Sequence, residues 1–560
     1  MKALKNRAFD LKAQYIFLAG AILGAIVFLL IYGISIVNPT NDAWLLNQNS
    51  DMTQHYLGWK FFRRSQWHFP LGLMDGVLVD DMVSCMFTDS IPMFAIFFKI
   101  LSPILPATFQ YAGIWCLFCY IAQSGISALI LRKFNKNLFF CLIGSTFFML
   151  SPPMLYRMFM HESLGGHWII LLAILLWVYQ NHKWKHKCTP IVLWAFAGII
   201  AVNVHVYFLP MIYMILIGYI ITDIAKNKKI LRPILCFVWT TLSSLLAMYC
   251  IGAFYGDGKM DDVGLGVFSA NLNTFFNGMG ISKFVIPMNI TIGQYEGFGY
   301  LGFGMLLAAF LAVIVIFKKA EKTGNGFFGG FKDIISAHRW EIIAFCAIVF
   351  ISFFIAASPI CSLNARTIYS IDYPEFIKKL LSVFRASGRF IWVADYLLYT
   401  AILAAISKLD GKKTILFTVS LCAILQYIDL RNYIKEKHET YSKPAAYVSA
   451  LPDSVWSDIA KDGEQIVFMS LPSDGAGIMR MYFVFAEYAL ENDMTLNTFH
   501  IARVDTTKRD EYVAQQYNLL SQGKGNPNYI YVFADKTRIP DNDNLTVYTA
   551  DGYTAVKVLS

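Results

Sequence analysis

Long runs of apolar residues recur along the first 430 residues and alternate with short polar loops. Runs of roughly 17 to 25 residues, at about 1.5 Å of helix per residue, can cross a hydrocarbon layer of about 30 Å. Such runs lie near residues 15–37, 109–131, 138–156, 165–180, 189–204, 206–223, 231–255, 298–317, 340–358, 391–408 and 413–430. The pattern predicts an α-helical polytopic membrane protein with about eleven transmembrane helices.

One apolar segment, residues 91–107, differs from the others. It is short, contains Lys99 and is interrupted by Pro103 and Pro106. Proline breaks a helix, and non-helical backbone at membrane depth needs protein or water around it. We therefore expect a re-entrant or interfacial segment rather than an independent crossing.

Lysine and arginine residues beside the apolar runs predict the orientation. Six basic clusters lie near residues 2–12, 132–136, 183–187, 226–232, 318–322 and 408–413. Basic loops favour the cytoplasmic side. Eleven crossings place all six clusters there, with the amino terminus in the cytoplasm and the carboxyl terminus outside. The first apolar run is too long for a signal peptide and is expected to remain as an anchor. Four loops are then expected outside, namely 38–90, 155–164, 256–297 and 359–390.

The chain changes character near residue 437, where charges become evenly spread and apolar runs shorten to strand length. Strands are predicted at 464–471, 495–504 and 528–534, helices at 479–490 and 508–520, and a hairpin of 545–550 with 553–559. The sequence thus predicts a transmembrane domain, 1–436, followed by a soluble extracytoplasmic α/β domain, 437–560. The second domain shows no phosphate-binding loop or nucleophile elbow and is expected to be accessory.

Composition narrows the function classes. Hydrophobic residues make up 56% of the chain and charged residues only 15%, against about 25% charged residues in soluble domains. The net charge of +9 comes from clusters beside helix ends, so we expect no nucleic-acid partner. Most of the ten cysteines lie in apolar segments, which argues against a disulfide framework.

The first outer loop holds the leading candidate for chemistry. Its stretch 50–64, SDMTQHYLGWKFFRR, sets Asp51 and His55 among aromatic residues suited to a membrane interface. A carboxylate there can act as a base or metal ligand on a lipid-linked substrate. The alternative is that Asp51 caps a helix beginning at Met52. Asp89, in FTDSIP, is either another N-cap or a second acid that shares a cation with Asp51.

A second outer loop carries HESLGGHW, residues 161–168. His161 and Glu162 are candidates for binding a phosphate-bearing substrate or supporting the base, and structural hydrogen bonding is the alternative. The spacing of His161 and His167 does not match a zinc motif.

Two further outer segments add polar groups. QYEGFGYLGFG, residues 294–304, places Gln294 and Glu296 before a glycine-rich helix start, where an acid can contact sugar hydroxyls and glycines allow close packing. FRASGRFIW, residues 384–392, places Arg385 and Arg389 at an outer helix end. Arginine can bind a phosphate through two parallel hydrogen bonds. Cations on the outer side run against the positive-inside trend, so topology alone does not explain these two arginines.

Together, DMTQHYLGWKFFR, FTDSIPMFAIFFK, FQYAGIW, HESLGGHW, QYEGFGYLGFG and FRASGRFIW resemble the GT-C class of glycosyltransferases. More narrowly, the set is similar to a bacterial family with GT-C-like membrane domains, over roughly residues 10–430. GT-C enzymes use polyprenyl-phosphate-linked sugars on the extracytoplasmic face, which implies a location in the bacterial cytoplasmic membrane. No WWD acceptor motif appears, so transfer to protein asparagine is not expected.

The resemblance also implies residue roles. An acid in the first outer loop of GT-C enzymes is the base or a metal ligand, and it corresponds to Asp51. Many members carry a pair of acids there, whereas Ser50 precedes Asp51 in this chain. The resemblance therefore implies no certain cofactor, with Mg²⁺ or Mn²⁺ as the candidate cation. Asp51 would activate an acceptor hydroxyl of a glycan or glycolipid, and Arg389, with Arg385 or His161, would stabilise the departing lipid phosphate.

Two other classes stay open. A glycolipid transporter or flippase would place charges at mid-membrane in broken helices and often shows inverted repeats. A non-catalytic cell-envelope assembly protein would use its tail to bind a partner. The acids lie in predicted outer loops and no clear repeat is visible, which favours the enzyme.

Overall fold

The computed structural model describes residues 2–256, 259–260, 264–321, 326–470 and 477–559. The chain divides into two compact units. The first, here the helical unit, comprises Met1–Val37, Gly113–Leu245 and Asp262–Lys443. The second, here the sheet unit, comprises Asn38–Ala112, Leu246–Asp261 and Pro444–Ser560. The segment 38–112, which contains the loop expected outside, is therefore grouped with the carboxyl-terminal part of the chain rather than with the helices that flank it.

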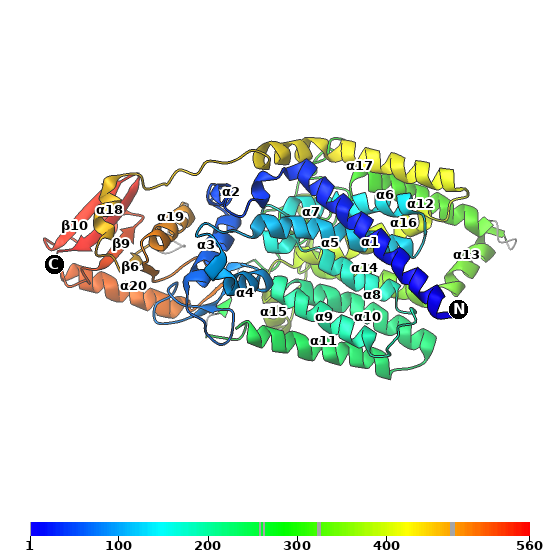
Figure 1. The fold of residues 1–560 in the computed structure, drawn as a ribbon, viewed down its shortest axis with the longest axis horizontal. Helices are drawn as coiled ribbons and strands as arrows, with labels where there is room; N and C mark the ends of the chain where they lie inside the picture. Colours follow the sequence, from blue (N-terminus) through cyan, green and yellow to red (C-terminus); the bar gives the residue numbers. More distant parts are fainter. Residues whose placement is uncertain (1, 257–258, 261–263, 322–325, 471–476, 560) are drawn as a thin grey trace. The chain divides into compact units, whose positions relative to one another are not determined.

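Within the described residues, eight helices are long and apolar enough to cross a membrane, so the chain is a multi-pass membrane protein. These candidate spans are Ala13–Tyr32 of α1 (Lys2–Tyr32), α5 (Ala112–Arg132), α10 (Phe208–Asn227), α11 (Leu231–Cys250), α12 (Phe303–Glu321), α14 (Arg339–Ala357), Ser387–Ile406, which contains α16 (Ile391–Ile406), and α17 (Lys412–Tyr441). Three shorter apolar helices are α6 (Leu138–Met149), α8 (Trp168–Val178) and α9 (Thr189–Val204). Every apolar run expected from the sequence to cross coincides with one of these helices (Figure 1).

Short elements connect the helices of this unit. They are α7 (Pro152–Arg157), η4 (Glu162–Gly165), η5 (Gln294–Gly297), α13 (Gly326–Ala337), β4 (Ile360–Leu363), β5 (Arg366–Ser370), α15 (Glu375–Ser382) and η6 (Ser387–Phe390). Strands β4 and β5 form an antiparallel pair.

A buried carboxylate fixes one of these connections. Asp429 of α17 is fully buried and accepts hydrogen bonds from the Tyr300 hydroxyl at 2.9 Å and the Phe303 amide at 3.0 Å. It also accepts one from the Ser282 hydroxyl at 2.5 Å. The loop that leads into α12 is thereby tied to α17, and the carboxylate oxygens are satisfied by several donors as buried polar atoms require.

The segment between α1 and α5 folds into α2 (Ala43–Leu46), α3 (Asp51–Arg64), β1 (Leu73–Met74), β2 (Val83–Ser84), η2 (Cys85–Thr88), α4 (Pro92–Ile100) and η3 (Ser102–Ile104). The nine residues of α4 give a helix of about 14 Å, too short to cross the membrane. Helix α3 begins at Asp51 with Ser50 as its N-cap. The alternative in which Asp51 caps a helix beginning at Met52 is therefore wrong.

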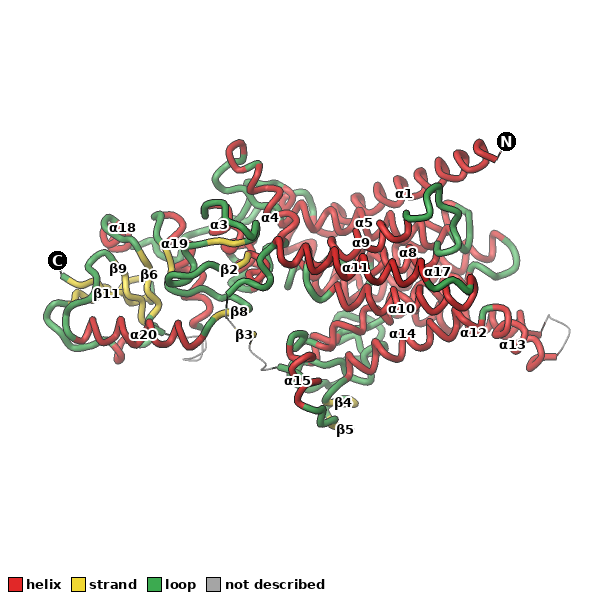
Figure 2. The backbone as a smooth tube through the Cα atoms, turned by 90° about the horizontal axis from the view of Figure 1, so that it is seen from below, coloured by secondary structure: helices red, strands yellow, loops and turns green. Residues whose placement is uncertain are grey.

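The carboxyl-terminal part of the sheet unit contains a five-stranded mixed sheet of order β10-β11-β9-β6-β7. Its strands are β6 (Gln465–Phe468), β7 (Thr495–Leu496), β9 (Tyr529–Phe533), β10 (Leu545–Ala550) and β11 (Tyr553–Val558). Helices α18 (Ser454–Ala460), α19 (Ile478–Glu491) and α20 (Thr506–Ser521) pack with it (Figure 2). The predicted hairpin around Asp551 and Gly552 is confirmed, and both residues have positive φ as a tight hairpin turn requires.

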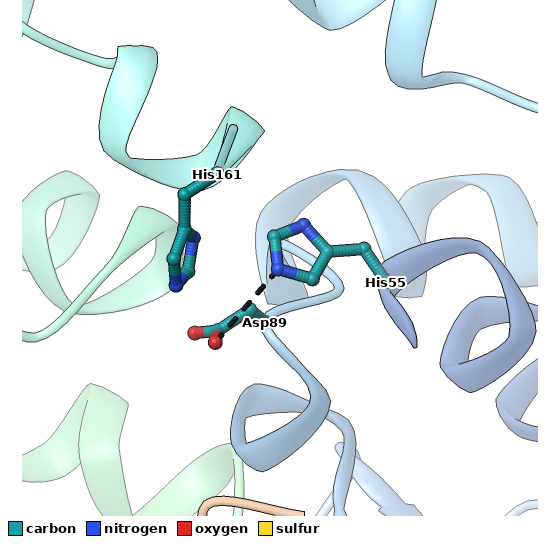
Figure 3. Close-up of side chains that lie close together, drawn as sticks. All are labelled: His55, Asp89 and His161. Atoms are coloured by element: carbon teal, nitrogen blue, oxygen red, sulfur yellow. Dashed lines mark ion pairs between the residues drawn. The ribbon is translucent and has the colours of Figure 1, made fainter. Parts of the chain in front are cut away.

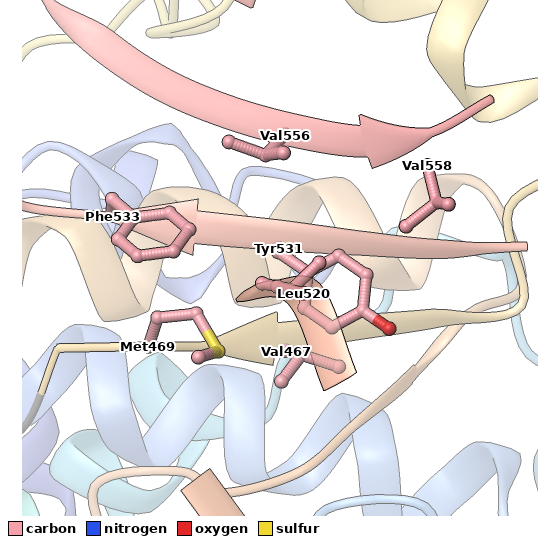
Figure 4. Packing of buried hydrophobic residues seen from close by; sticks show 7 residues of the cluster. All are labelled: Val467, Met469, Leu520, Tyr531, Phe533, Val556 and Val558. Atoms are coloured by element: carbon pink, nitrogen blue, oxygen red, sulfur yellow. The ribbon is translucent and has the colours of Figure 1, made fainter. Parts of the chain in front are cut away.

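The central strands β6, β9 and β11 are largely buried on both faces, and successive side chains alternate between the two. One face packs Val467, Tyr531 and Val556 against Leu520 of α20 (Figure 4). On the other face, the ring of Phe468 stacks on Tyr482 of α19 at 4.2 Å. The sheet therefore lies between two layers of helix.

The prediction of one strand over 495–504 is wrong. Strand β7 ends at Leu496, and β8 (Arg503–Val504) instead pairs with β3 (Lys259–Met260). The side chain of Asn497 accepts a hydrogen bond from the Phe468 amide at 2.8 Å and donates one to its carbonyl at 3.2 Å. An asparagine side chain thus takes the place of the next backbone ladder bonds, and the strand stops there.

Candidate functional site

The candidate site of the helical unit is built where η5 and η6 meet. A Cβ atom on Gly388 would lie 2.6 Å from the backbone nitrogen and Cα of Gly297. The two backbones are therefore too close to leave room for a side chain at Gly388. The Gly388 amide also donates to the Phe268 carbonyl at 2.9 Å. This close approach places Glu296 of η5 beside Arg389 of η6.

Glu296 lies between two arginines. Arg389 Nε donates to Glu296 Oε2 at 2.7 Å, and one terminal nitrogen of Arg157 lies 2.8 Å from the same oxygen. The other terminal nitrogen of Arg157 donates to Oε1 at 3.2 Å. The side chains of Arg157, Glu296 and Arg389 are 3%, 9% and 11% exposed. We call these three residues the arginine–glutamate cluster.

The electrostatics of this cluster keep Glu296 ionised. Burial by itself would raise the pKa of the Glu296 carboxyl, but Arg389 and Arg157 outweigh that effect and hold the pKa below its ordinary value. Guanidinium groups held in fixed positions can bind a phosphate through paired hydrogen bonds.

Aromatic rings surround the two guanidinium groups. Arg389 lies over the ring of Tyr207 at 4.6 Å, and Arg157 lies 5.9 Å from the ring of Tyr295 and 6.0 Å from that of Trp392. The Tyr207 hydroxyl accepts a hydrogen bond from the Ala386 amide at 2.9 Å, which fixes its ring under Arg389. Such contacts orient guanidinium planes and supply flat apolar surfaces.

His161 and Glu162 lie in the same unit. His161 Nδ1 is 3.2 Å from the Ser163 hydroxyl, and its ring lies 5.6 Å from that of His205. His161 also lowers the pKa of Glu296, so it belongs to the electrostatic surroundings of the cluster. Glu162 is 1% exposed, and its main-chain carbonyl accepts a hydrogen bond from Trp115 Nε1 at 2.7 Å.

Gln294 and Arg385 flank the cluster in sequence but differ from it in setting. The Gln294 side-chain oxygen accepts from Asn271 Nδ2 at 2.7 Å and from the Thr291 amide at 3.2 Å, while its nitrogen donates to the Ser269 hydroxyl. These bonds shape the loop ahead of η5. Arg385 is half-buried beside Gly264.

The other predicted site residues belong to the sheet unit. Asp51 is exposed in the first turn of α3, where a helix favours negative charge. His55 follows one turn later, and its Nε2 lies 3.8 Å from Oδ2 of Asp89 (Figure 3). Asp89 has a left-handed backbone, with φ of 57°, at the end of η2. It is not the N-cap of α4, which is Ile91, so the capping alternative for Asp89 is wrong.

Hydrogen bonds hold the turn that presents Asp89. Thr88 and Ser90 hydroxyls lie 2.8 Å apart, and the Ser90 hydroxyl donates to the His55 carbonyl at 3.0 Å. A Cβ on Gly58 would lie 2.4 Å from the Thr88 hydroxyl oxygen, so this glycine allows α3 to pack directly on the turn. Backbone packing thus holds Asp89 beside His55.

A family model described as "Domain of unknown function (DUF6311)" matches residues 21–431, and a model described as "DUF6311 C-terminal domain" matches residues 455–558. The chain belongs to the DUF6311 family. No curated protein matches it. The sequence changes character near residue 437, within the interval 432–454 that separates the two DUF6311 matches.

In this DUF6311 member, sequence reasoning missed Arg157 and Asp395. Arg385 and Arg389 were singled out because a cation in an outer loop runs against the positive-inside trend. Arg157 also lies in a loop expected outside, so the same signal applies to it. Asp395 is an acid inside the apolar run of α16, is 1% exposed, and has no hydrogen-bond partner for either carboxylate oxygen among the described residues. Ionisable residues in such runs are rare, which is the signal that could have found it.

Proposed function

We propose that this protein is an integral membrane glycosyltransferase that transfers a sugar from a polyprenyl-phosphate-linked donor to a glycan or glycolipid acceptor. The observation that carries the proposal is the arginine–glutamate cluster. Two buried guanidinium groups contact one carboxylate beside aromatic rings. A lipid-linked phosphosugar combines the two features that such a site fits, a phosphate and a sugar face.

The proposal includes a topology. Eleven crossings are obtained if the three shorter apolar helices α6, α8 and α9 cross together with the eight long ones. The amino terminus then lies in the cytoplasm, and the carboxyl-terminal domain outside the bacterial cytoplasmic membrane. Supporting this, the basic clusters fall on one side under that count, and α4 is too short to alter the parity. The donor would bind on the extracytoplasmic face.

In the proposed reaction, Asp51 is the general base. It would take the proton of an acceptor hydroxyl as that oxygen attacks the anomeric carbon, and the bond to the lipid phosphate would break with its electron pair on the phosphate oxygen. Arg389 and Arg157 would stabilise the negative charge of the departing phosphate. Glu296 would hold both arginines in position, and Gln294, His161, Glu162 and Arg385 would contribute to substrate binding.

His55 and Asp89 would orient the acceptor or hold a divalent cation, Mg²⁺ or Mn²⁺. An imidazole and a carboxylate held close together are ligands that Mn²⁺ accepts. Transfer measured with each metal and with a chelator tests that part of the proposal separately.

The test is transfer of labelled sugar from polyprenyl-phosphate donors by the purified full chain in lipid nanodiscs. Asp51→Asn should abolish transfer, while Asp543→Asn, at another exposed acid of the sheet unit, should leave it unchanged. Arg389→Gln should lower transfer by at least about 100-fold, and Arg366→Gln, at an exposed arginine of β5, should not. Full activity of folded Asp51→Asn would remove Asp51 from the mechanism. Movement of the glycolipid across the bilayer without sugar transfer would replace the enzyme by a flippase.

A further inference from the structure

A second cationic feature lies in the helical unit, in the connection that follows α8 and at the junction of α10 and α11. A cavity of about 800 Å³ opens there, lined by residues 180–184, 186–188, 190–191, 223, 227, 229, 231–232 and 235. We call it the basic cavity. It is large enough for a lipid headgroup, since ligand pockets commonly enclose about 300–1,000 Å³.

The lining carries more positive than negative charge. Lys183, Lys187, Lys229 and Arg232 line it, and Asp223 is the acid of the lining, so the formal net charge is +3 with histidines neutral. The charge of Asp223 is already balanced, because Arg232 forms an ion pair with it and Asn227 donates to it at 2.6 Å. The three lysines are exposed and available to an anion.

The cavity also borders an apolar surface. Leu231 and Leu235 line it at the start of α11, and α11 continues with exposed apolar side chains at Leu231, Ile234 and Val238. Trp184, also in the lining, is a residue type that favours the boundary between headgroups and acyl chains. A charged cavity that opens onto an exposed apolar helix suits an amphiphile better than a soluble anion.

The basic cavity is distinct from the arginine–glutamate cluster. Helix α10 links the two sites. Tyr207, the residue just before α10, lies beside Arg389, and Asp223, in the last two turns of α10, lines the basic cavity. Tyr207 and Asp223 are sixteen positions apart, which corresponds to about 24 Å of helix. A ligand of the basic cavity therefore lies near the opposite end of this apolar helix from the cluster.

We propose that the basic cavity binds the phosphate of an anionic membrane lipid, with the acyl chains along α11. Lysines provide point charges for the phosphate, and the apolar face of α11 accommodates the chains. Basic pockets between transmembrane helices are suited to phosphate headgroups for this reason. This site does not depend on the proposed transferase reaction.

Native mass spectrometry of the purified full chain tests the proposal. The protein is titrated with phosphatidylglycerol, with phosphatidylcholine and with inorganic phosphate. Wild-type protein should retain phosphatidylglycerol in preference to phosphatidylcholine, and the triple variant Lys183→Gln, Lys187→Gln, Lys229→Gln should bind it at least about tenfold more weakly. The control Lys318→Gln, Lys319→Gln, Lys408→Gln removes the same charge from other helix ends and should bind as wild type.

Either of two results would overturn the assignment. Equal retention of phosphatidylglycerol by the two triple variants would show that the basic cavity is not its site. Binding of inorganic phosphate with no preference for phosphatidylglycerol would replace the lipid by a soluble anion.

A chemical readout locates the ligand. Cys188 lines the cavity and is an exposed free cysteine. In a Cys346→Ser background, which removes another exposed thiol, phosphatidylglycerol should slow maleimide modification of Cys188 severalfold, and phosphatidylcholine should not. An unchanged rate at lipid concentrations that saturate binding would place the lipid elsewhere.

Discussion

Arg389 Nε lies 2.7 Å from Glu296 Oε2, and the contact depends on two glycines, Gly297 and Gly388, that directly adjoin the paired residues in sequence. Charge attraction and the contact between the two glycine backbones therefore both position Glu296 and Arg389. Charge attraction alone does not define the geometry of a long arginine side chain, whereas the glycine contact limits where the Cα of Arg389 can lie.

Removing the shared carboxylate should destabilise the helical unit. Glu296→Ala removes the carboxylate that both buried guanidinium groups contact, and loss of one partner of a buried pair costs about 3–5 kcal/mol. Glu296→Gln should cost less because an acceptor oxygen remains. Thermal unfolding of the detergent-solubilised protein measures the effect, with Glu375→Gln, at an exposed acid of the same unit, as the control. Equal melting temperatures for Glu296→Ala and wild type would contradict the prediction.

The pH dependence of this pair follows from the sign of the shift. Because the folded pKa of Glu296 lies below its ordinary value of 4.5, its contribution is present above pH 4.5 and is lost as the pH falls toward the folded pKa. Acid unfolding of Glu296→Gln should therefore be shallower than that of wild type.

Gly388→Ala should disturb the site more than an ordinary glycine substitution. Its methyl group would meet the backbone of Gly297, which cannot rotate away, and Arg389 should then move from Glu296. In Gly144→Ala the methyl group would meet the Leu131 side chain, which can adopt another rotamer. We expect a loss of about 3 kcal/mol or misfolding for Gly388→Ala and at most about 1 kcal/mol for Gly144→Ala. Similar unfolding temperatures for the two variants would refute the role of the glycine contact.

Glu487 should make the stability of the sheet unit depend on pH near neutrality. Burial, with the nearby carboxylates of Glu491 and Asp42, raises the pKa of Glu487 to about 7, although a hydrogen bond from Tyr447 opposes the shift. The folded state binds the proton more tightly than the unfolded state, so stability should fall as the pH rises from about 4.5 to 7, by about 3 kcal/mol. Melting temperatures at pH 5 and pH 8 should differ less in Glu487→Gln.

The control for that measurement is Glu511→Gln, at an exposed acid on α20. It should keep the wild-type pH dependence. If Glu487→Gln retains the full difference between pH 5 and pH 8, another group is responsible.

Asp429→Ala should loosen the loop before α12. Tyr300, Ser282 and the Phe303 amide would each lose an acceptor, and an unsatisfied buried donor costs about 1–3 kcal/mol. Asp429→Asn keeps one acceptor oxygen and should be milder. Hydrogen exchange of residues 278–302 should rise strongly in the alanine variant, and unchanged protection there would show that other contacts hold the loop.

Much of the helical architecture could be predicted from sequence because membrane helices need long apolar runs, and each predicted crossing coincides with a helix. Contacts between loops distant in sequence could not be predicted with the same ease. The glycine-rich start of QYEGFGYLGFG indicated close packing, but its partner, Gly388, lies in another segment. Likewise the strand predicted over 495–504 has a suitable apolar pattern, yet a side-chain hydrogen bond from Asn497, which periodicity does not reveal, ends it.

The candidate site was predicted in part. Glu296 and Arg389 were both singled out, one for sugar hydroxyls and the other for phosphate, and their pairing required the fold. Arg157 was missed because the histidines and the acid of its loop, in HESLGGHW, were the more conspicuous residues. Asp51, His55 and Asp89 stay predictions as reacting groups, although the short distance from His55 to Asp89 shows that this pair is brought together locally.

The composition of the sheet unit bears on how the chain is made. Its parts lie before α5, at the end of α11 and after α17, and its contacts include Gln54 with the His500 carbonyl at 2.8 Å and the pairing of β3 with β8. Gln54 precedes His500 by more than 400 residues, so this unit can be completed only after the intervening helices have been synthesised. Until then, the surface of α3 that packs against α19 lacks its partner.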